Sequence, residues 1–142
     1  MVIILLGILA VYAAPRMFNS GDFYARGFHD ETLALLRYAQ KTAIAQRRTV
    51  CVTFSSTTAT LTMASAGGAT DCTSGTALTG PNGAPTITAR SGVSYSATTN
   101  FNFDGLGQPI AATGGTAMAT QTIQISNASN VIVEAQTGYV HD

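Results

Sequence analysis

The sequence predicts an α+β fold in which an apolar N-terminal helix continues into an amphipathic helix that packs on an antiparallel β-sheet or on two small sheets. Three observations predict it. The first fourteen residues carry no charge. Residues 33–48 contain no Gly or Pro and place apolar side chains at helical spacing. After Thr49, short β-branched runs alternate with turns rich in Gly, Ser and Thr.

The N-terminal run shows no polar stripe, which distinguishes it from an amphipathic helix at a protein surface. A helix that is apolar on every face lies in lipid or deep among other helices, and a chain of 142 residues has no interior large enough to surround it. Fourteen residues rise about 21 Å, less than the roughly 30 Å of a hydrocarbon core. The run is therefore a partial span, a signal-peptide core, or a span without its beginning. The lack of a preceding basic residue and the Pro15 that follows Ala14 disfavour a cleaved signal.

The helical segments are expected to differ in regularity. Pro15 should kink the first helix rather than end it. Residues 19–27 should be irregular, because two glycines there are unfavourable in a helix. Asp30 then opens a second helix, since acids are favoured at a helix N-terminus. The apolar face of this helix should lie across a sheet and consists of Leu35, Leu36, Ala39, Ala43 and Ile44. The expected domains are a helix and stem at 1–27 and a globular domain at 28–142.

Short strands are expected throughout the second half of the chain. Residues 64–85, rich in Gly, Ser and Thr, should form a long loop between them. Asp104 and Gly105 supply turn chemistry, and Gly138 allows a bend near the end of the chain. The first two and the last two runs should each form a hairpin, and the predicted strands are 50–54, 59–63, 86–89, 93–96, 101–103, 121–126 and 131–136.

Cys51 and Cys72, 21 positions apart, are the two cysteines of the chain. Their even number and the Ser/Thr-rich context favour one disulfide formed in an oxidising compartment. Two free buried thiols are the alternative. The two distant histidines, His29 and His141, do not complete the spacing of a structural zinc site.

No pattern in the sequence indicates catalysis or a cofactor. Asp104 is followed by no further acids at calcium-loop spacing, so a turn is expected there. Asn127 begins an Asn-x-Ser pattern that turn chemistry explains equally well. We therefore expect neither an enzyme nor a cofactor or metal.

Charge is unevenly distributed although the net charge is zero. Residues 1–48 carry a balance of +3 and the remainder −3. A basic stem and an acidic head could pair between neighbouring copies; the plainer reading is that a solvated helix carries more charge than threonine-rich strands. A net charge of zero supplies little of the electrostatic attraction on which nucleic-acid binding depends.

The run VIILLGILAVYAAPRM resembles the N-terminal helix of type IV pilins and type II secretion pseudopilins. Its Gly7, Ile8–Leu9–Ala10 and Pro15 stand where that helix has its inner glycine, its ILA motif and its proline. The resemblance implies that a leader, a processing glycine and the first seven mature residues, including a glutamate, precede Met1. It assigns as the membrane and filament helix Val2, Ile3, Ile4, Leu5, Leu6, Gly7, Ile8, Leu9, Ala10, Val11 and Pro15.

The helix at 33–48, the strand VCVTF, the turn FNFDGLGQP and the ending TGYVH are similar to one minor pilin class. This class includes the H-type pseudopilin of type II secretion, the FimT-like minor pilins and the MshC-like minor pilins of mannose-sensitive haemagglutinin (MSHA) pili. The cysteine pair and the ending VEAQTGYVHD are most similar to the MshC-like branch. DNA-binding FimT-like pilins carry basic residues near the C-terminus, which this chain lacks, so nucleic acid is not an expected partner.

The resemblance implies a pilin fold and a single-pass protein of the bacterial inner membrane with its C-terminal domain in the periplasm. Prepilin peptidase would process the precursor, methylation would follow, and the apolar helix would pack among other pilin or pseudopilin subunits. The implied role is a minor subunit that assembles or primes an MSHA-like type IV pilus. The alternatives are a secretion pseudopilin, a major subunit, or a tip adhesin that uses the loops at 64–85 and 111–120.

Overall fold

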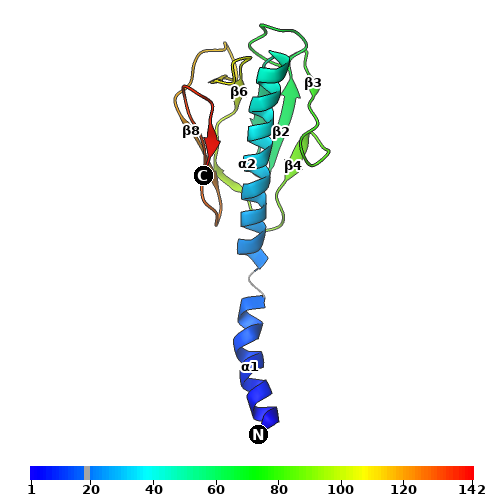
Figure 1. Ribbon diagram of the computed structural model, residues 1–142, viewed down its shortest axis with the longest axis vertical. Helices are drawn as coiled ribbons and strands as arrows, with labels where there is room; N and C mark the ends of the chain where they lie inside the picture. Colours follow the sequence, from blue (N-terminus) through cyan, green and yellow to red (C-terminus); the bar gives the residue numbers. More distant parts are fainter. Residues whose placement is uncertain (18–19) are drawn as a thin grey trace.

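The computed structural model describes the backbone of residues 1–17 and 20–142 and the side chains of residues 1–9, 11 and 21–142. Two helices, α1 (Val2–Met17) and α2 (Ser20–Gln46), precede ten short strands (Figure 1). α1 remains helical through Pro15, so this proline does not end the helix, as expected. The kink predicted near Pro15 falls where the side chains of α1 and residues 18–19 lie outside the described part of the chain.

The irregular stretch expected before residue 28 is absent from the described residues. α2 begins at Ser20 and passes through Gly21 and Gly27 without interruption, so the prediction was wrong from residue 20 onward. Each glycine costs a helix about 1 kcal/mol relative to alanine. Ala25 and Phe28 on the same turns are buried in the core, and this packing offsets the cost.

The helix ends two residues earlier than the sequence suggests, at Gln46. Arg47 adopts a left-handed conformation with φ of 50°. The Arg48 amide donates to the Ala43 carbonyl at 3.2 Å, and the Arg47 amide donates to the Ile44 carbonyl at 3.3 Å. This pair of bonds is the Schellman arrangement that closes many helices, with arginine where glycine is usual.

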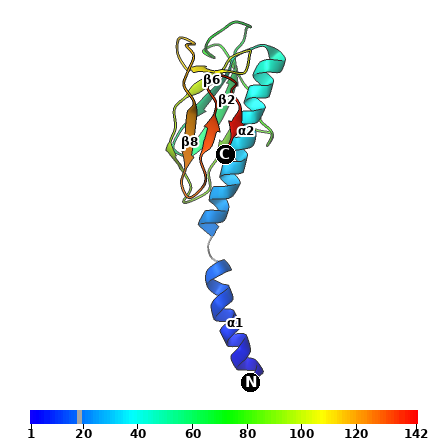
Figure 2. The same cartoon turned by 60° about the vertical axis from the view of Figure 1, so that its left-hand side comes forward.

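Two antiparallel sheets pack beside α2, and together with it they form what we call the head (Figure 2). The larger sheet has the order β3-β2-β1-β6-β7, with β4 also paired to β2. Its strands are β1 (Val50–Phe54), β2 (Thr58–Met63), β3 (Thr76–Ala77), β4 (Thr86–Thr88), β6 (Phe101–Phe103) and β7 (Pro109–Ala111). The smaller sheet has the order β10-β9-β8-β5 and consists of β5 (Tyr95–Ala97), β8 (Gln121–Ile125), β9 (Val131–Val133) and β10 (Val140–His141).

Both predicted hairpins are present. β1 pairs with β2 from Val50 opposite Met63 onward, and β8 pairs with β9 through a turn in which Asn127 has a φ of 57°. The sequence did not predict β3, β7 or β10. β3 and β10 are only two residues long, and β7 begins with Pro109, a residue that a sheet accepts at an edge such as this one.

The core lies between α2 and the inner faces of the two sheets. The predicted helix face is confirmed at Leu35, Leu36, Ala39 and Ala43, which are fully buried. Ile44 is the exception: it is 47% exposed and lies beside the turn that contains Gly107. The strands contribute Val50, Val52, Leu61, Phe101, Phe103, Ile123, Val131, Val133 and Val140 to this core.

Candidate assembly surface

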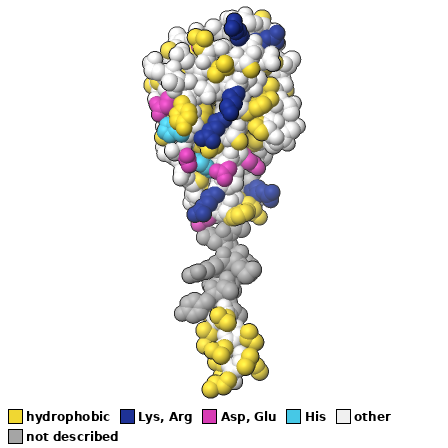
Figure 3. All heavy atoms as spheres, in the orientation of Figure 1, with side chains coloured by type: hydrophobic (Ala, Val, Ile, Leu, Met, Phe, Trp, Pro, Cys, Tyr) yellow, Lys and Arg dark blue, Asp and Glu magenta, His cyan; other side chains and the backbone are white. Residues whose placement is uncertain are grey.

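The described side chains of α1 form an apolar surface that nothing in the head covers. The large aliphatic residues among them are between 51% and 84% exposed, and Figure 3 shows them as a continuous hydrophobic end of the molecule. They are Val2, Ile3, Ile4, Leu5, Leu6, Ile8, Leu9 and Val11. Burying one such side chain contributes about 1.5–3 kcal/mol. Together they supply a driving force on the order of 10 kcal/mol for transfer into lipid or among other helices.

Gly7 leaves one side of α1 open to close approach. A Cβ placed on it would meet nothing within 4 Å. Small residues of this kind allow helix backbones to approach each other in lipid. The other small residue predicted for this purpose, Ala10, has a side chain outside the described residues, as does Pro15. Among the described residues, no helix combines the length and the hydropathy that a membrane crossing requires.

The head does not need α1 to complete its core. The buried cluster begins at Ala25 and includes no described side chain of α1. The apolar helix can therefore exchange one environment for another without opening the head. This independence is what a subunit needs if it moves from a bilayer into a helical assembly.

The predicted disulfide is present and holds a loop against the sheet. Cys51 of β1 bonds to Cys72, with 6.2 Å between the Cα atoms. Thr49 Oγ1 donates to the carbonyl of Ala69 in the same loop. Nearby, Asn102 Nδ2 donates to the carbonyl of Thr70 at 3.0 Å. Residues 64–75 are thus fixed at several points, more firmly than their composition suggests.

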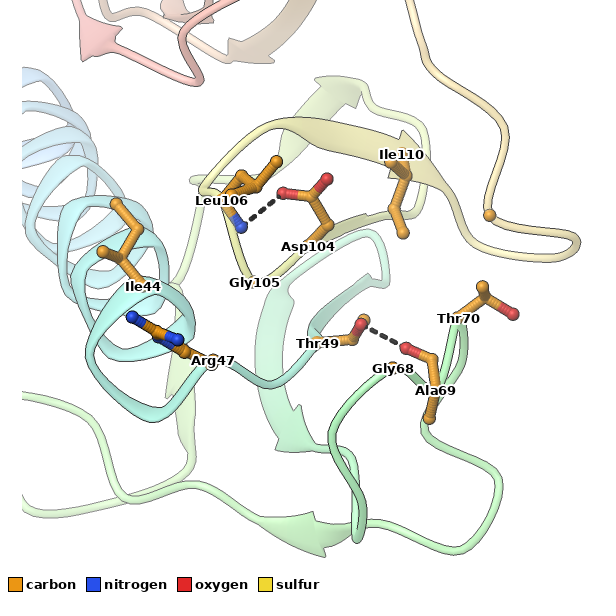
Figure 4. A pocket seen from close by; sticks show the side chains of 11 residues that line it. Ile44, Arg47, Thr49, Gly68, Ala69, Thr70, Asp104, Gly105, Leu106 and Ile110 are labelled. Carbon is orange, nitrogen blue, oxygen red and sulfur yellow. Dashed lines mark hydrogen bonds between the residues drawn. The ribbon is translucent and has the colours of Figure 1, made fainter.

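The end of α2 borders a hollow of about 750 Å³ (Figure 4). Ile44, the loop with Ala69 and Thr70, and the turn between β6 and β7 surround it. Asp104 is part of that turn: its Oδ1 accepts bonds from the amides of Leu106 and Gln108, both at 2.9 Å. The predicted turn is confirmed, and the carboxylate is used to close it. Leu106 projects from the turn with 77% of its surface exposed.

An ion pair lies on the smaller sheet, where His141 Nε2 meets Glu134 Oε1 at 2.9 Å. The hydrogen bond from His141 lowers the pKa of Glu134, and the bond to Glu134 raises the pKa of His141. Tyr139 stacks on the His141 ring with the centroids 5.2 Å apart. This cluster ties β10 to the residue that follows β9. In the part of the chain that the structure describes, no three His, Cys, Asp or Glu side chains gather as a metal site would require.

The second histidine, His29, lies in α2. The Nδ1 atom of His29 is 3.2 Å from Asp30 Oδ1, and its Nε2 atom is buried without a hydrogen-bond partner among the described residues. Sequence reasoning missed Asn102, although an asparagine between two phenylalanines in a short strand was the available signal. It also gave no role to Phe23, a large side chain next to Tyr24 in a segment expected to be irregular.

Comparison with known proteins returned one family. The model of the family described as type II transport protein GspH matches residues 30–138. No curated protein matches the chain, and no solved structure matches it. The matched region covers most of the head and begins after α1.

Proposed function

The chain belongs to the family of type II transport protein GspH, and on that premise we propose that it is a membrane-anchored minor subunit of a pilus-like filament. The family gives it a pilin- or pseudopilin-like structural role in type II secretion or in a pilus, with other such subunits as partners. The proposal adds the anchor: α1 holds the subunit at the inner membrane until it packs among neighbouring helices. The role is structural rather than catalytic.

The observation that carries this proposal is the exposed apolar surface of α1 beside a head with its own core. An apolar helix exchanges lipid for neighbouring helices at little hydrophobic cost, and close packing then decides whether it associates. The proposed partners are the inner membrane, other pilin or pseudopilin subunits, and a prepilin peptidase that acts on the precursor. Methylation of the processed subunit is part of the same proposal. Nucleic acid is not among the proposed partners.

The anchor is tested by placing a charge in α1. Leu6→Lys introduces a side chain that costs about 2.5–3.5 kcal/mol in the centre of a hydrocarbon core. The matched control is Leu106→Lys, because both leucines are well exposed but Leu106 lies in the head beside the C-terminal end of α2 (Figure 4). In a deletion strain, Leu6→Lys should weaken membrane retention and prevent normal filament assembly, whereas Leu106→Lys should leave membrane association unchanged. Normal assembly with lysine at position 6 would contradict the proposal.

Within this role, we propose a function in assembling or priming an MSHA-like type IV pilus. The ending VEAQTGYVHD and the cysteine pair support this branch. A pseudopilus for protein export is the alternative. A deletion strain separates the two: loss of surface pili with normal protein export supports the pilus, and loss of export with normal pili supports the pseudopilus.

A tip adhesin is the second candidate, because the loop at 64–85 presents exposed residues on a framework held by Cys72. Shortening the exposed residues 65–68 tests this function. Reduced adhesion with an unchanged number of filaments would support it. Unchanged adhesion after the same shortening would exclude residues 65–68 as a binding site.

A further inference from the structure

Two aromatic side chains and an arginine form a cluster at the start of α2, which we call the base collar: Phe23, Tyr24 and Arg90. Phe23 is 75% exposed, although it is one of the larger apolar side chains of the head. Its ring meets the Tyr24 ring edge-on, with the centroids 6.5 Å apart. Arg90 Cζ lies 5.2 Å from the centroid of the Tyr24 ring. Tyr24 itself packs partly against the core, so the collar is fixed to the head.

The base collar borders a groove of about 400 Å³. Phe28 and Thr88 contribute to its walls, and Gly27 keeps it open, since a Cβ there would meet nothing within 4 Å. Figure 3 shows hydrophobic side chains beside basic ones at this end of the head. Aromatic rings next to cationic groups are typical of protein segments that lie at the boundary between lipid and water.

The position of the collar in the chain places it near the end of α1. Phe23 follows Met17, the last residue of α1, by only six positions, and six residues of chain span at most about 20 Å. The headgroup layer on each side of a bilayer is roughly 5–8 Å thick. Side chains on a helix also lean toward its N-terminus, which for α2 is the side of α1.

We propose that the base collar seats the head on the bilayer surface, with Phe23 at the boundary between lipid headgroups and acyl chains. Arg90 and the exposed Arg26 would lie level with the lipid phosphates. This inference rests on the proposed function, because it requires α1 in the membrane. A seated head holds the subunit in one orientation before assembly. The aromatic rings and not the net charge carry the contact, since Asp22 and Glu31 balance the two arginines locally.

The chain contains no tryptophan, so a single Phe23→Trp substitution gives a reporter without background. The full chain is reconstituted in phosphatidylcholine vesicles that carry spin-labelled lipids. We expect a blue-shifted emission and several-fold stronger quenching by labels at the headgroup level than by labels at the acyl-chain end. The matched control is Leu106→Trp, equally exposed in the head but at the far end of α2. Its emission should remain unshifted and respond to soluble iodide instead.

A third reporter separates this inference from the anchor. Leu9→Trp lies in α1 and should be quenched by acyl-chain labels if the helix is inserted. Quenching at position 9 without quenching at position 23 overturns the seat and leaves the proposed function intact. No quenching at either position overturns both.

Two further results decide what covers Phe23. If its emission is blue-shifted but unquenched by lipid, and the shift disappears when protein is diluted in excess vesicles, a neighbouring subunit covers it and the seat is wrong. Adding phosphatidylglycerol or 0.5 M salt should leave the quenching unchanged, because anionic lipid and salt both act on charge–charge interactions and the proposed contact is made by aromatic rings. A strong loss of quenching in salt would contradict a seat made by aromatic rings.

Discussion

Cys51 and Asn102 lie directly opposite each other in the register of β1 and β6, and both bind the loop at 64–75. Cys51 reaches it through the disulfide to Cys72. Asn102 reaches it through the carbonyl of Thr70 and also contacts the carbonyl of Ala112 at 3.4 Å. Two neighbouring side chains on the outer face of one sheet therefore fix the longest loop of the head.

Removing the disulfide should lower the free energy of unfolding. The bond closes a loop of 21 residues, for which the chain-entropy model gives about 3 kcal/mol. Cys51→Ser with Cys72→Ser is compared with Ser74→Ala, an exposed change in the same loop, by chemical denaturation. Equal stability of the double serine variant and the unmodified protein would contradict this prediction.

Asn102→Ala should destabilise the head by about 1–3 kcal/mol, because the side chain is only 2% exposed and its loss removes the hydrogen bonds to the carbonyls of Thr70 and Ala112. Asn130→Ala, at an exposed position, serves as the control and should change stability by about 0.5 kcal/mol or less. Hydrogen exchange should also accelerate in residues 64–75 of the Asn102 variant. Exchange that rises equally throughout the head would show that Asn102 supports the fold in general and not this loop.

Arg47→Gly should stabilise the protein by about 0.5–1 kcal/mol. Arg47 has a φ of 50° at the end of α2, a conformation that costs an L-residue about 1–2 kcal/mol and that glycine adopts freely. Part of the gain is lost to the greater freedom of glycine in the unfolded chain. Arg48→Gly is the control and should lower the stability of the protein, because Arg48 does not have a positive φ and gains nothing from glycine. A lower midpoint of thermal unfolding for Arg47→Gly would refute the prediction.

Much of the head could be predicted because its signals are local. The strand at 101–103 and both hairpins follow from β-branched and aromatic runs with turn residues between them. The start of α2 could not be predicted, because Gly21 and Gly27 oppose a helix locally and only the burial of Ala25 and Phe28 by distant strands outweighs them. The apolar surface of α1 could be predicted because it follows from the composition of one continuous segment. The base collar could not, because it depends on the contact of Arg90 with Tyr24, which are far apart in the sequence.

Gly138→Ala should be among the most damaging small substitutions in the head. A Cβ at this position would lie 1.7 Å from the Gly107 carbonyl oxygen, and Gly138 has a φ of 66°. Gln40 of α2 joins the same two loops through bonds to Gly107 and Thr137. Gly83→Ala is the matched control, since its φ is 82° but a Cβ there meets nothing. We expect Gly138→Ala to cost about 2 kcal/mol more in unfolding free energy than the control; equal costs would show that the clash relaxes.

The pair of His141 and Glu134 should make the stability of the C-terminal hairpin depend on pH in both directions. The pKa of Glu134 lies below its ordinary value near 4.5, so its contribution is present above that pH and is lost as the pH falls through the lowered pKa. The pKa of His141 lies above its ordinary value near 6.5, so its contribution is complete below that pH and is lost as the pH rises through the raised pKa. The stability difference between the unmodified protein and His141→Gln should therefore be largest between pH 4.5 and 6.5 and shrink on either side. Denaturation midpoints across pH measure it, with Glu31→Gln as an exposed control; a difference that is constant with pH would show that the imidazole acts through packing against Tyr139 alone.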